Sequence, residues 1–259
     1  LLDVLDLLDQ PLPRYAYEPL PEAMPFRHSI TLNQLAFRYA DQAPWILRGL
    51  SIDVPRCGRI GIVGTTGSGK STLLDVIMGL LQPTEGILAI DGVSITSENH
   101  RTWQAHIAHV PQTIFLADTT IAENIAFGVP PDQIDYGRVH QAAQKAQFAQ
   151  TVESWEHRYN TLVGERGVRL SGGQRQRIGI ARALYKEDDV IVFDEATSAL
   201  DNDTERAVME AIENLDEDLT VIIVAHRLST LKNCTQVIEL ADGRIKRSGT
   251  YEEIIGEVA

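Results

Sequence analysis

The sequence is poor in cysteine, in basic side chains and in long hydrophobic runs, and each shortage excludes a class of protein. Its 259 residues include two cysteines, Cys57 and Cys234, which match neither a disulfide framework nor a metal-ligand spacing. The longest apolar run, at residues 76–81, is far shorter than the roughly 20 residues that span a bilayer. We therefore expect a protein of a reducing compartment, with no membrane span inside this chain.

The shortage of basic residues concerns the partners of the protein. Lys and Arg number 23 against 36 Asp and Glu, which gives a formal net charge of -13. Such a surface repels a phosphate backbone and argues against nucleic acid as a partner, although a local basic pocket for one nucleotide stays compatible with it. The hydrophobic share of 44% is that of an ordinary globular chain with a large core.

Residues 1–27 differ in composition from the rest of the chain. Leu1, Leu5 and Leu8 share one helical face, and five of the eleven prolines follow before residue 26. Proline fixes φ and removes a backbone donor, so this stretch is typical of an extended connector. We expect residues 1–27 to be a linker from an upstream domain or a frayed terminus, and residues 28–259 to form the folded domain.

The folded part alternates between strand and helix patterns. Residues 30–39 alternate with a slip near Asn33, and short buried strands are expected at 59–63, 86–90, 107–110, 190–193, 220–225 and 236–240. The last strand leads into a hairpin turn at residues 241–244. A helix is expected at residues 70–80, and residues 119–184 are mostly helical. This order predicts an α/β fold with a parallel sheet and an inserted helical subdomain.

The strongest local signal is a glycine-rich loop between a buried strand and a helix. Residues 64–71 read GTTGSGKS and fit the pattern G-x-x-x-x-G-K-[ST]. Glycines let backbone amides approach phosphate oxygens, and the helix N-terminus adds positive partial charge. Lys70 supplies a cation for the β- and γ-phosphates, and Ser71 supplies a hydroxyl for Mg²⁺. The strand before and the helix after favour this interpretation over a flexible turn.

Two acidic residues follow the strand expected at residues 190–193. Ligands of α/β sheets bind at the carboxyl ends of strands, where Asp194 and Glu195 would lie. Asp194 can hold Mg²⁺ through water, and Glu195 can orient and deprotonate an attacking water, because glutamate is ionised at neutral pH. An acid pair that merely favours a helix N-terminus is the alternative.

A third motif, LSGGQ at residues 170–174, marks a helix start. Ser171 and Gln174 fit an S-x-x-Q capping box, which explains these two residues without any ligand. It does not explain Gly172 and Gly173, which weaken a first helical turn. Two glycines are useful there if a phosphate must approach the helix tip closely.

Together these motifs resemble the nucleotide-binding domain of ATP-binding cassette (ABC) transporters. The match extends from Tyr39 to about Gly249, and residues 170–174 are similar to the family signature. The resemblance implies that Tyr39 stacks on adenine, where a core tyrosine is the alternative. It implies that Gln112 reaches Mg²⁺ and the water, and that His226 contacts the γ-phosphate, where a core histidine is the alternative. Residues 198–201, SALD, resemble the D-loop.

The resemblance implies an ATPase with ATP and Mg²⁺ as its cofactors and three sets of site residues. The nucleotide-binding set is Tyr39, Gly64, Thr65, Thr66, Gly67, Ser68, Gly69, Lys70, Ser71, Thr72, Ser171, Gly172, Gly173 and Gln174. The catalytic set is Lys70, Gln112, Glu195 and His226, and the metal set is Ser71, Gln112 and Asp194. The implied fold is a P-loop NTPase with a mostly parallel core sheet, an N-terminal antiparallel β subdomain and a helical subdomain at roughly residues 113–184.

Several segments are similar to the exporter branch of the family. Residues 120–125, TIAENI, and 163–167, VGERG, resemble exporter segments, and the second meets the coupling helices of the membrane part. Residues 1–10 resemble the cytosolic end of the last membrane helix, so we expect a transmembrane domain upstream in the same polypeptide and a location at the cytoplasmic face of a membrane. The turn RCGR at residues 56–59 departs from the usual P-x-G-E-like turn, which implies a local surface change.

The resemblance also implies a head-to-tail dimer, most simply a homodimer. Each ATP would lie between residues 64–71 of one copy and residues 171–174 of the other. Two other functions stay open: a soluble ABC-type ATPase that acts on ribosomes or DNA, and a regulatory module that binds nucleotide without hydrolysis. The acidic charge disfavours the first, and the presence of Glu195 and His226 disfavours the second. A GTPase is disfavoured because the sequence has no N-K-x-D segment.

Overall fold

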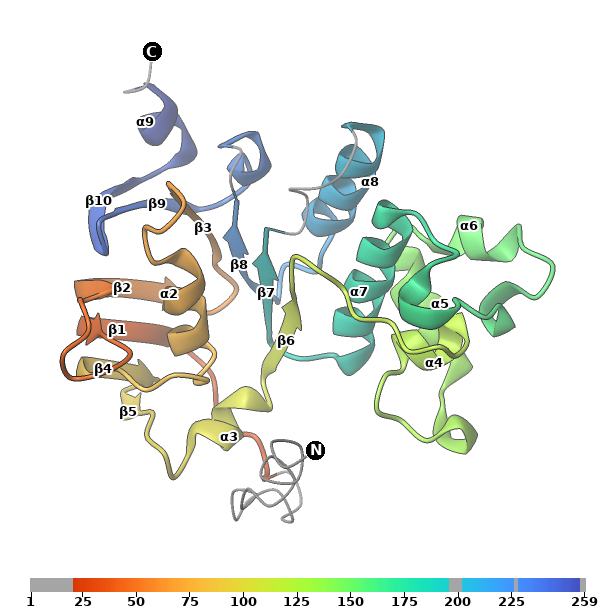
Figure 1. Cartoon of the computed structure of the whole chain (residues 1–259), viewed down its shortest axis with the longest axis horizontal. Coiled ribbons are helices and arrows are strands. Elements are labelled where there is room, and N and C mark those ends of the chain that lie inside the picture. The colour runs from red at the N-terminus through yellow and green to blue at the C-terminus, as the bar shows by residue number, and fades with distance from the viewer. Residues whose placement is uncertain (1–20, 196–201, 226–227, 257–259) are drawn as a thin grey trace, which may run out of the picture.

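The computed structural model describes residues 21–195, 202–225 and 228–256, whose strands form two sheets (Figure 1). The smaller sheet has the order β2-β1-β4-β5, and its pairs are antiparallel. Its strands are β1 (Ser29–Phe37), β2 (Leu47–Pro55), β4 (Glu85–Ile90) and β5 (Val93–Ser94). The slip expected near Asn33 is confirmed, because the register with β4 shifts between Asn33 and Ala36, where Gln34 has a φ of 48°.

The larger sheet has the order β10-β9-β3-β8-β7-β6 and is parallel except for the β9–β10 pair. Its strands are β3 (Arg59–Gly64), β6 (Ile107–Val110), β7 (Val190–Asp194), β8 (Thr220–Val224), β9 (Gln236–Ala241) and β10 (Arg244–Gly249). The expected hairpin is confirmed: Asp242 and Gly243 form a two-residue turn with φ values of 49° and 72°. Because β3, β7 and β8 run parallel, the segments that follow them meet at one edge of the sheet.

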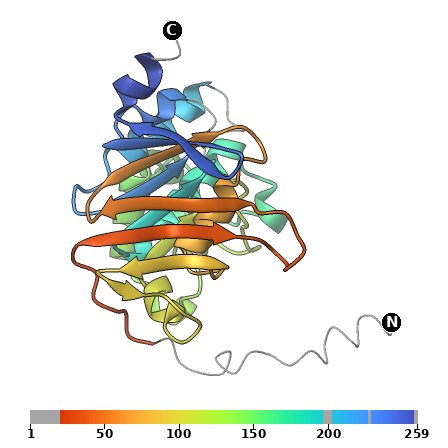
Figure 2. The same ribbon diagram turned by 90° about the vertical axis from the view of Figure 1, so that its left-hand side faces the viewer.

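Alternate residues of the parallel strands enter two separate hydrophobic clusters. Val190 and Val192 belong to the cluster that contains the small sheet and α2 (Lys70–Ile77). Ile191 and Phe193 belong to the cluster formed with the helices on the other side. Those helices are α4 (Ile121–Ile125), α5 (Tyr136–Lys145), α6 (Ala149–Glu153), α7 (Gly172–Lys186) and α8 (Asn202–Glu213). Figure 2 looks onto the antiparallel strands, which lie opposite α4–α7 in Figure 1.

The predicted fold class is confirmed. The helices α4 to α7 stand between β6 and β7 in the chain and pack beside the parallel sheet, which makes them the expected helical insertion. The short helices α3 (His100–Gln104) and α9 (Tyr251–Gly256) complete the architecture, with 3-10 turns at Pro131–Gln133, Arg158–Asn160, Glu165–Gly167 and Leu228–Leu231. In the part of the chain that the structure describes, no helix combines the length and the apolar character that a bilayer crossing requires.

The helix expected at residues 70–80 ends earlier, so that prediction was wrong at its C-terminal end. The helix α2 stops at Ile77, and Gly79 takes the left-handed conformation with a φ of 68°. The Gly79 amide donates to the Val76 carbonyl at 2.9 Å, and the Leu80 amide donates to the Asp75 carbonyl at 2.8 Å. A glycine just after a helix closes it in this way because it lacks the Cβ that penalises positive φ.

The chain enters the fold along an aromatic cluster beside β6. Phe26 is buried and meets the Trp103 ring edge-on at 5.4 Å. The two ring nitrogens of His106 face the Met24 carbonyl oxygen and, at 2.6 Å, the Asp189 carboxylate. Residues 24–26 are therefore fixed to the residues that precede β6 and β7. The linker expected at residues 1–27 lies mostly outside the described residues, and the connection at 21–27 has no helix or strand.

Candidate functional site

The loop between β3 and α2 curls tightly, and glycine permits its geometry. Gly64 has a φ of 156°, and a Cβ on it would lie 2.4 Å from the Leu240 carbonyl oxygen and 2.6 Å from Ser68 Oγ. Gly69, directly before α2, has a φ of 99°. Ser68 is buried, whereas Thr65, Thr66 and Gly67 are exposed at the mouth of the loop. The loop thus presents its backbone outward at the N-terminus of a helix, which is the geometry of an anion site.

Lys70 is buried within this loop, with 5% of its surface exposed. Its ammonium group donates to the Gly64 carbonyl at 2.9 Å and to the Thr65 carbonyl at 3.2 Å. An ammonium group has three protons to donate, so these two contacts fix its position and leave capacity for a phosphate oxygen. The main chain of the loop therefore fixes the position of the Lys70 ammonium group.

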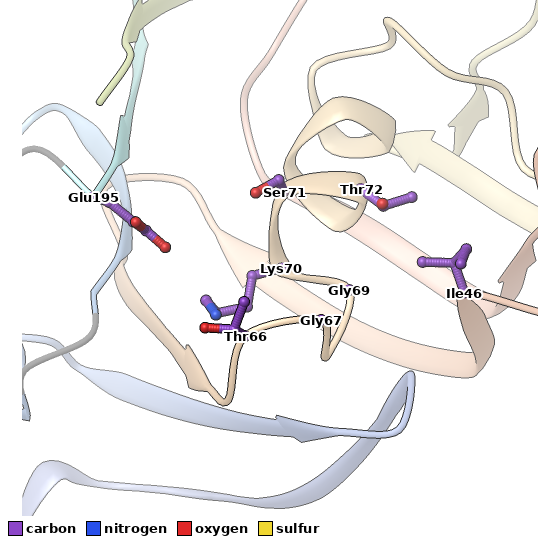
Figure 3. Close-up of a pocket in the computed structure, with 8 residues that line it drawn as sticks. All are labelled: Ile46, Thr66, Gly67, Gly69, Lys70, Ser71, Thr72 and Glu195. Carbon is purple, nitrogen blue, oxygen red and sulfur yellow. The ribbon is translucent and has the colours of Figure 1, made fainter. Parts of the chain in front are cut away.

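The loop and Glu195 line one cavity of about 360 Å³. Its lining residues are Ile46, Thr66, Gly67, Gly69, Lys70, Ser71, Thr72 and Glu195 (Figure 3). Seven of these eight were predicted as site residues from the sequence. In Figure 3, Ile46 and Glu195 stand at opposite ends with the glycine-rich loop between them. The cavity is therefore an elongated space along the loop, with an apolar side chain at one end and a carboxylate at the other.

Tyr39 stands near the Ile46 end of the cavity. Its hydroxyl lies 3.3 Å from the Thr72 hydroxyl, and its ring meets the Phe37 ring edge-on at 4.9 Å. The side chain is exposed, at 63% of its reference surface, which excludes the alternative of a core tyrosine. An exposed ring held from one side offers a face on which a planar base can stack.

Asp194 ends β7 and Glu195 follows it, at the same sheet edge as the loop. Burial and the neighbouring Glu195 carboxylate raise the pKa of Asp194, while His109 and Lys70 act to lower it. Its Oδ1 atom is buried without a hydrogen-bond partner among the described residues. Glu195 has a φ of 51°, uncommon for a residue other than glycine, and its amide donates to the Val224 carbonyl at 3.0 Å. This bend turns the Glu195 side chain into the cavity.

Sequence reasoning missed two residues near Asp194. His109 on β6 lies beside Val192 in the sheet register, and Asp75 lies one turn after Ser71 on α2. Burial lowers the pKa of His109, although the negative charges of Asp194 and Asp75 act to raise it. Burial also raises the pKa of Asp75. Only the tertiary fold brings a strand residue and a helix residue to this place, so no local motif could have indicated them.

The signature segment begins α7 with the capping box that the sequence predicts. The Gln174 amide donates to Ser171 Oγ at 3.2 Å, and the Ser171 amide donates to Gln174 Oε1 at 2.9 Å. Ser171 and Gly172 are exposed, whereas Gly173 is buried. None of these residues lines the cavity at the glycine-rich loop, and α7 stands on the other side of the sheet from α2 in Figure 1. The structure therefore does not bring residues 171–174 to this chain's own phosphate loop.

The remaining predicted residues divide into two groups. Gln112 follows β6, is exposed and does not line the cavity, and the neighbouring Pro111 carbonyl accepts a hydrogen bond from Gln176 of α7 at 3.4 Å. The expected D-loop at 198–201 and His226 lie outside the described residues. Ile46 is the cavity residue that the sequence did not indicate, since an apolar residue before a strand fits a core position equally well.

Comparison with known proteins agrees with this geometry. Residues 47–198 match the family model described as ABC transporter. The ATP-dependent lipid A-core flippase of Cupriavidus metallidurans is 37% identical over 256 residues, which are 98% of this chain and 43% of that protein. The flippase of Chromohalobacter salexigens is 40% identical over 228 residues, 88% of this chain and 39% of that protein.

A solved structure shows the same fold at similar identity. The structure of a bacterial Atm1-family ABC exporter with ATP bound matches with a TM-score of 0.85 and 34% identity, and the match covers 100% of this chain and 45% of that one. The chain spans less than half the length of each of these relatives. The phosphate loop, the acidic strand end and the match over residues 47–198 agree, and the chain belongs to the ABC transporter family as one of its ATPase domains.

Proposed function

We propose that this chain binds ATP with Mg²⁺, hydrolyses it, and powers an exporter by pairing head to tail with a second copy. One observation supports this above the others. A single cavity joins the phosphate loop and Glu195, while the signature helix of the same chain begins outside it with an exposed tip. In a pair of copies, the exposed helix N-terminus of each copy would complete the nucleotide site of the other.

The cavity gives the nucleotide one orientation. The triphosphate would follow the loop past Gly67 and Lys70, so that its terminal phosphate lies toward Glu195. The nucleoside would then lie at the other end, near Ile46 and Thr72, with the base against the exposed Tyr39 ring. The loop amides and the Lys70 ammonium would bind the β- and γ-phosphates.

The residues present fit a magnesium ion that arrives with the nucleotide. Ser71, Gln112 and Asp194 offer oxygen ligands, which Mg²⁺ prefers, and the buried Oδ1 atom of Asp194 has no other partner among the described residues. Within that same part of the chain, no group of three His, Cys, Asp or Glu side chains could hold a metal alone, so phosphates and water would supply the other ligands. When bound, the ion offsets charge on the phosphate oxygens.

Hydrolysis would then rest on positioning and electrostatics. Glu195, turned into the cavity by its backbone bend, would orient a water in line with the γ-phosphorus and accept its proton as the new P–O bond forms. The bond from the γ-phosphorus to the β–γ bridging oxygen would break at the same time, and ADP would leave with that oxygen. Lys70 would stabilise the negative charge on the phosphoryl oxygens. By family resemblance, His226 would contact the γ-phosphate and Gln112 the attacking water.

The relatives support the proposed partners and location. Two copies would trap ATP between the loop of one and residues 171–174 of the other, and loss of the γ-phosphate would release them. The relatives are named flippases and exporters and are more than twice as long as this chain, which supports a membrane domain upstream in the same polypeptide. The ATPase domain would then lie at the cytoplasmic face of a membrane, and a lipid is the first cargo to test.

The test of hydrolysis is the substitution Glu195→Gln. A glutamine keeps the shape of the side chain and cannot accept the proton, so we expect ATP binding to persist while phosphate release falls by about 100-fold or more. Glu98→Gln, at an exposed residue outside the cavity, is the matched control and should keep the parental rate. A parent chain that binds ATP and releases no phosphate would indicate the regulatory module, and parental turnover in Glu195→Gln would refute the role of this residue.

A further inference from the structure

One wall of the nucleotide cavity takes no part in the proposed hydrolysis step. Ile46 lines the cavity beside Gly69 and Thr72, at the end away from Glu195 (Figure 3). Its amide donates to the Phe37 carbonyl at 2.9 Å, which fixes it beside the end of β1. Ile46 thus stands where the proposed function places the nucleoside.

Two glycines that are distant in the sequence approach the main chain of Ile46. A Cβ on Gly69 would lie 3.1 Å from the Ile46 carbonyl oxygen, and a Cβ on Gly243 would lie 2.1 Å from the same oxygen. At Gly243 the obstacle is a backbone atom, so no side-chain rotation relieves the contact. At Gly69 the Leu47 side chain lies closer still, at 2.9 Å. The main chain of Ile46 is therefore held between the phosphate loop and the β9–β10 turn.

The β9–β10 turn is also hydrogen-bonded to the strand that follows Ile46. The Arg48 amide donates to the Gly243 carbonyl at 2.8 Å, and the Arg244 guanidinium donates to the Arg48 carbonyl at 3.4 Å. These bonds fix the distance between the turn and β2. A side chain added at Gly243 would have to displace either these bonds or the Ile46 main chain.

We propose that Gly243 is a positioning residue of the nucleotide site. Because Gly243 has no side chain, the β9–β10 turn can lie close enough to Ile46 to hold its main chain next to the phosphate loop. This contact would set the space for the nucleoside. This proposal rests on the proposed ATP function and concerns the nucleoside end of the cavity alone. The phosphate end, formed by Gly67 and Lys70, keeps its own geometry.

The chain contains a matched control for a substitution at this glycine. Asp91 and Gly92 form the turn between β4 and β5, with φ values of 49° and 82°, and they repeat the Asp-Gly pair of the β9–β10 turn. A Cβ on Gly92 would meet nothing within 4 Å. Gly243→Ala and Gly92→Ala therefore carry the same penalty for positive φ, and Gly243→Ala alone adds the contact with Ile46.

The measurement compares ATP with inorganic tripolyphosphate by titration calorimetry of the whole chain. We expect Gly243→Ala to weaken ATP binding by about tenfold, which corresponds to about 1.4 kcal/mol of lost contact at the nucleoside end. Tripolyphosphate binding should stay at the parental value in the same variant, and Gly92→Ala should match the parent for both ligands. In steady-state assays the loss should appear in KM for ATP, with kcat close to that of the parent.

A second variant keeps the proposal testable if Gly243→Ala does not fold. Ile46→Ala shortens the wall without a change in the turn, and it should also weaken ATP but not tripolyphosphate. The proposal is overturned if Gly243→Ala behaves like Gly92→Ala, if both ligands weaken equally, or if Ile46→Ala keeps the parental preference for ATP. A parent chain that binds neither ligand would instead refute the proposed function.

Discussion

At the scale of single residues, the site keeps charges that the fold does not neutralise. Asp194 is half-buried and has Glu195 and Asp75 as acidic neighbours, and burial together with these charges raises its pKa. One of its oxygens is buried without a hydrogen-bond partner within the described residues. A group in this state costs stability in the metal-free protein, which is a common property of residues kept for a ligand.

The substitution Asp194→Asn should therefore stabilise the metal-free chain while it lowers ATP hydrolysis. We expect a gain of about 1 kcal/mol, or about 3 °C in melting temperature for a domain of this size. The raised pKa means that the folded state binds this proton more tightly than the unfolded chain does. The ionised Asp194 therefore lowers the free energy of unfolding by its full amount above the pKa that this group has in the folded state. This loss of stability shrinks as the pH falls and vanishes below the ordinary pKa of 3.8.

Thermal unfolding at several pH values without added magnesium checks this prediction. The stability gain of Asp194→Asn over the parent should be largest at neutral pH and should narrow in acid. Asp132→Asn, at an exposed position, is the control and should change the melting temperature by less. An Asp194→Asn variant that melts below the parent at neutral pH would contradict the account of an uncompensated charge.

At the scale of elements, the signature helix packs directly on the segment that carries Gln112. A Cβ on Gly179 of α7 would lie 2.4 Å from Ile114 Cδ1 and 2.9 Å from Ile114 Cγ1. Ile114 is buried and stands two residues after Gln112. The glycine lets α7 and this segment approach each other more closely than any other residue would, so a movement of one displaces the other.

Gly179→Ala should for this reason disturb the Gln112 segment. Alanine is the better helix former, but the forced overlap should outweigh that gain and leave a net loss of about 1–2 kcal/mol. We expect kcat to fall as well, because Ile114 must shift and Gln112 lies close to it in the chain. Chemical denaturation and phosphate release measure the two effects.

The double variant Gly179→Ala with Ile114→Ala is the control, because it removes the side chain that the new methyl group meets. Its loss of stability should be smaller than the sum of the two single losses, which shows coupling between the two positions. Purely additive losses would show that α7 and the Gln112 segment do not depend on each other.

At the scale of the whole molecule, the two phosphate-binding elements that the sequence predicts lie apart from each other. The phosphate loop and Glu195 share the cavity, whereas Ser171 and Gly172 present an exposed helix start elsewhere. Under the proposed function, a single copy would offer one half of each of two sites. Bound ATP would hold the two copies together, and its hydrolysis would release them.

Ser171→Arg should abolish ATP-induced pairing in the Glu195→Gln background while each monomer still binds ATP. The arginine side chain would fill the space where the second copy's nucleotide must approach the helix tip. Size exclusion with ATP and Mg²⁺ should show a dimer for Glu195→Gln and a monomer for the double variant. Ser97→Arg adds the same side chain at an exposed loop serine and should leave the dimer intact. A dimer that survives Ser171→Arg would refute the shared site.

The sequence predicted those parts of the site whose chemistry is local. The capping box of Ser171 and Gln174 involves residues three positions apart, and Gly64 to Ser71 form one loop between adjacent elements. The sequence could not place Ile46 against Gly243, because their contact joins a loop before β2 to a turn between β9 and β10. It could not place His109 near Asp194 for the same reason.

The two cysteines differ in a way that makes one of them a ready attachment point. Burial raises the pKa of Cys234 to about 12, so that its thiol stays protonated and unreactive near neutral pH. Cys57 is exposed in the turn before β3. A maleimide spin label or fluorophore would therefore modify Cys57 selectively in the natural chain. Dipolar spectroscopy or energy transfer between labelled copies could then follow their separation during turnover without any engineered residue.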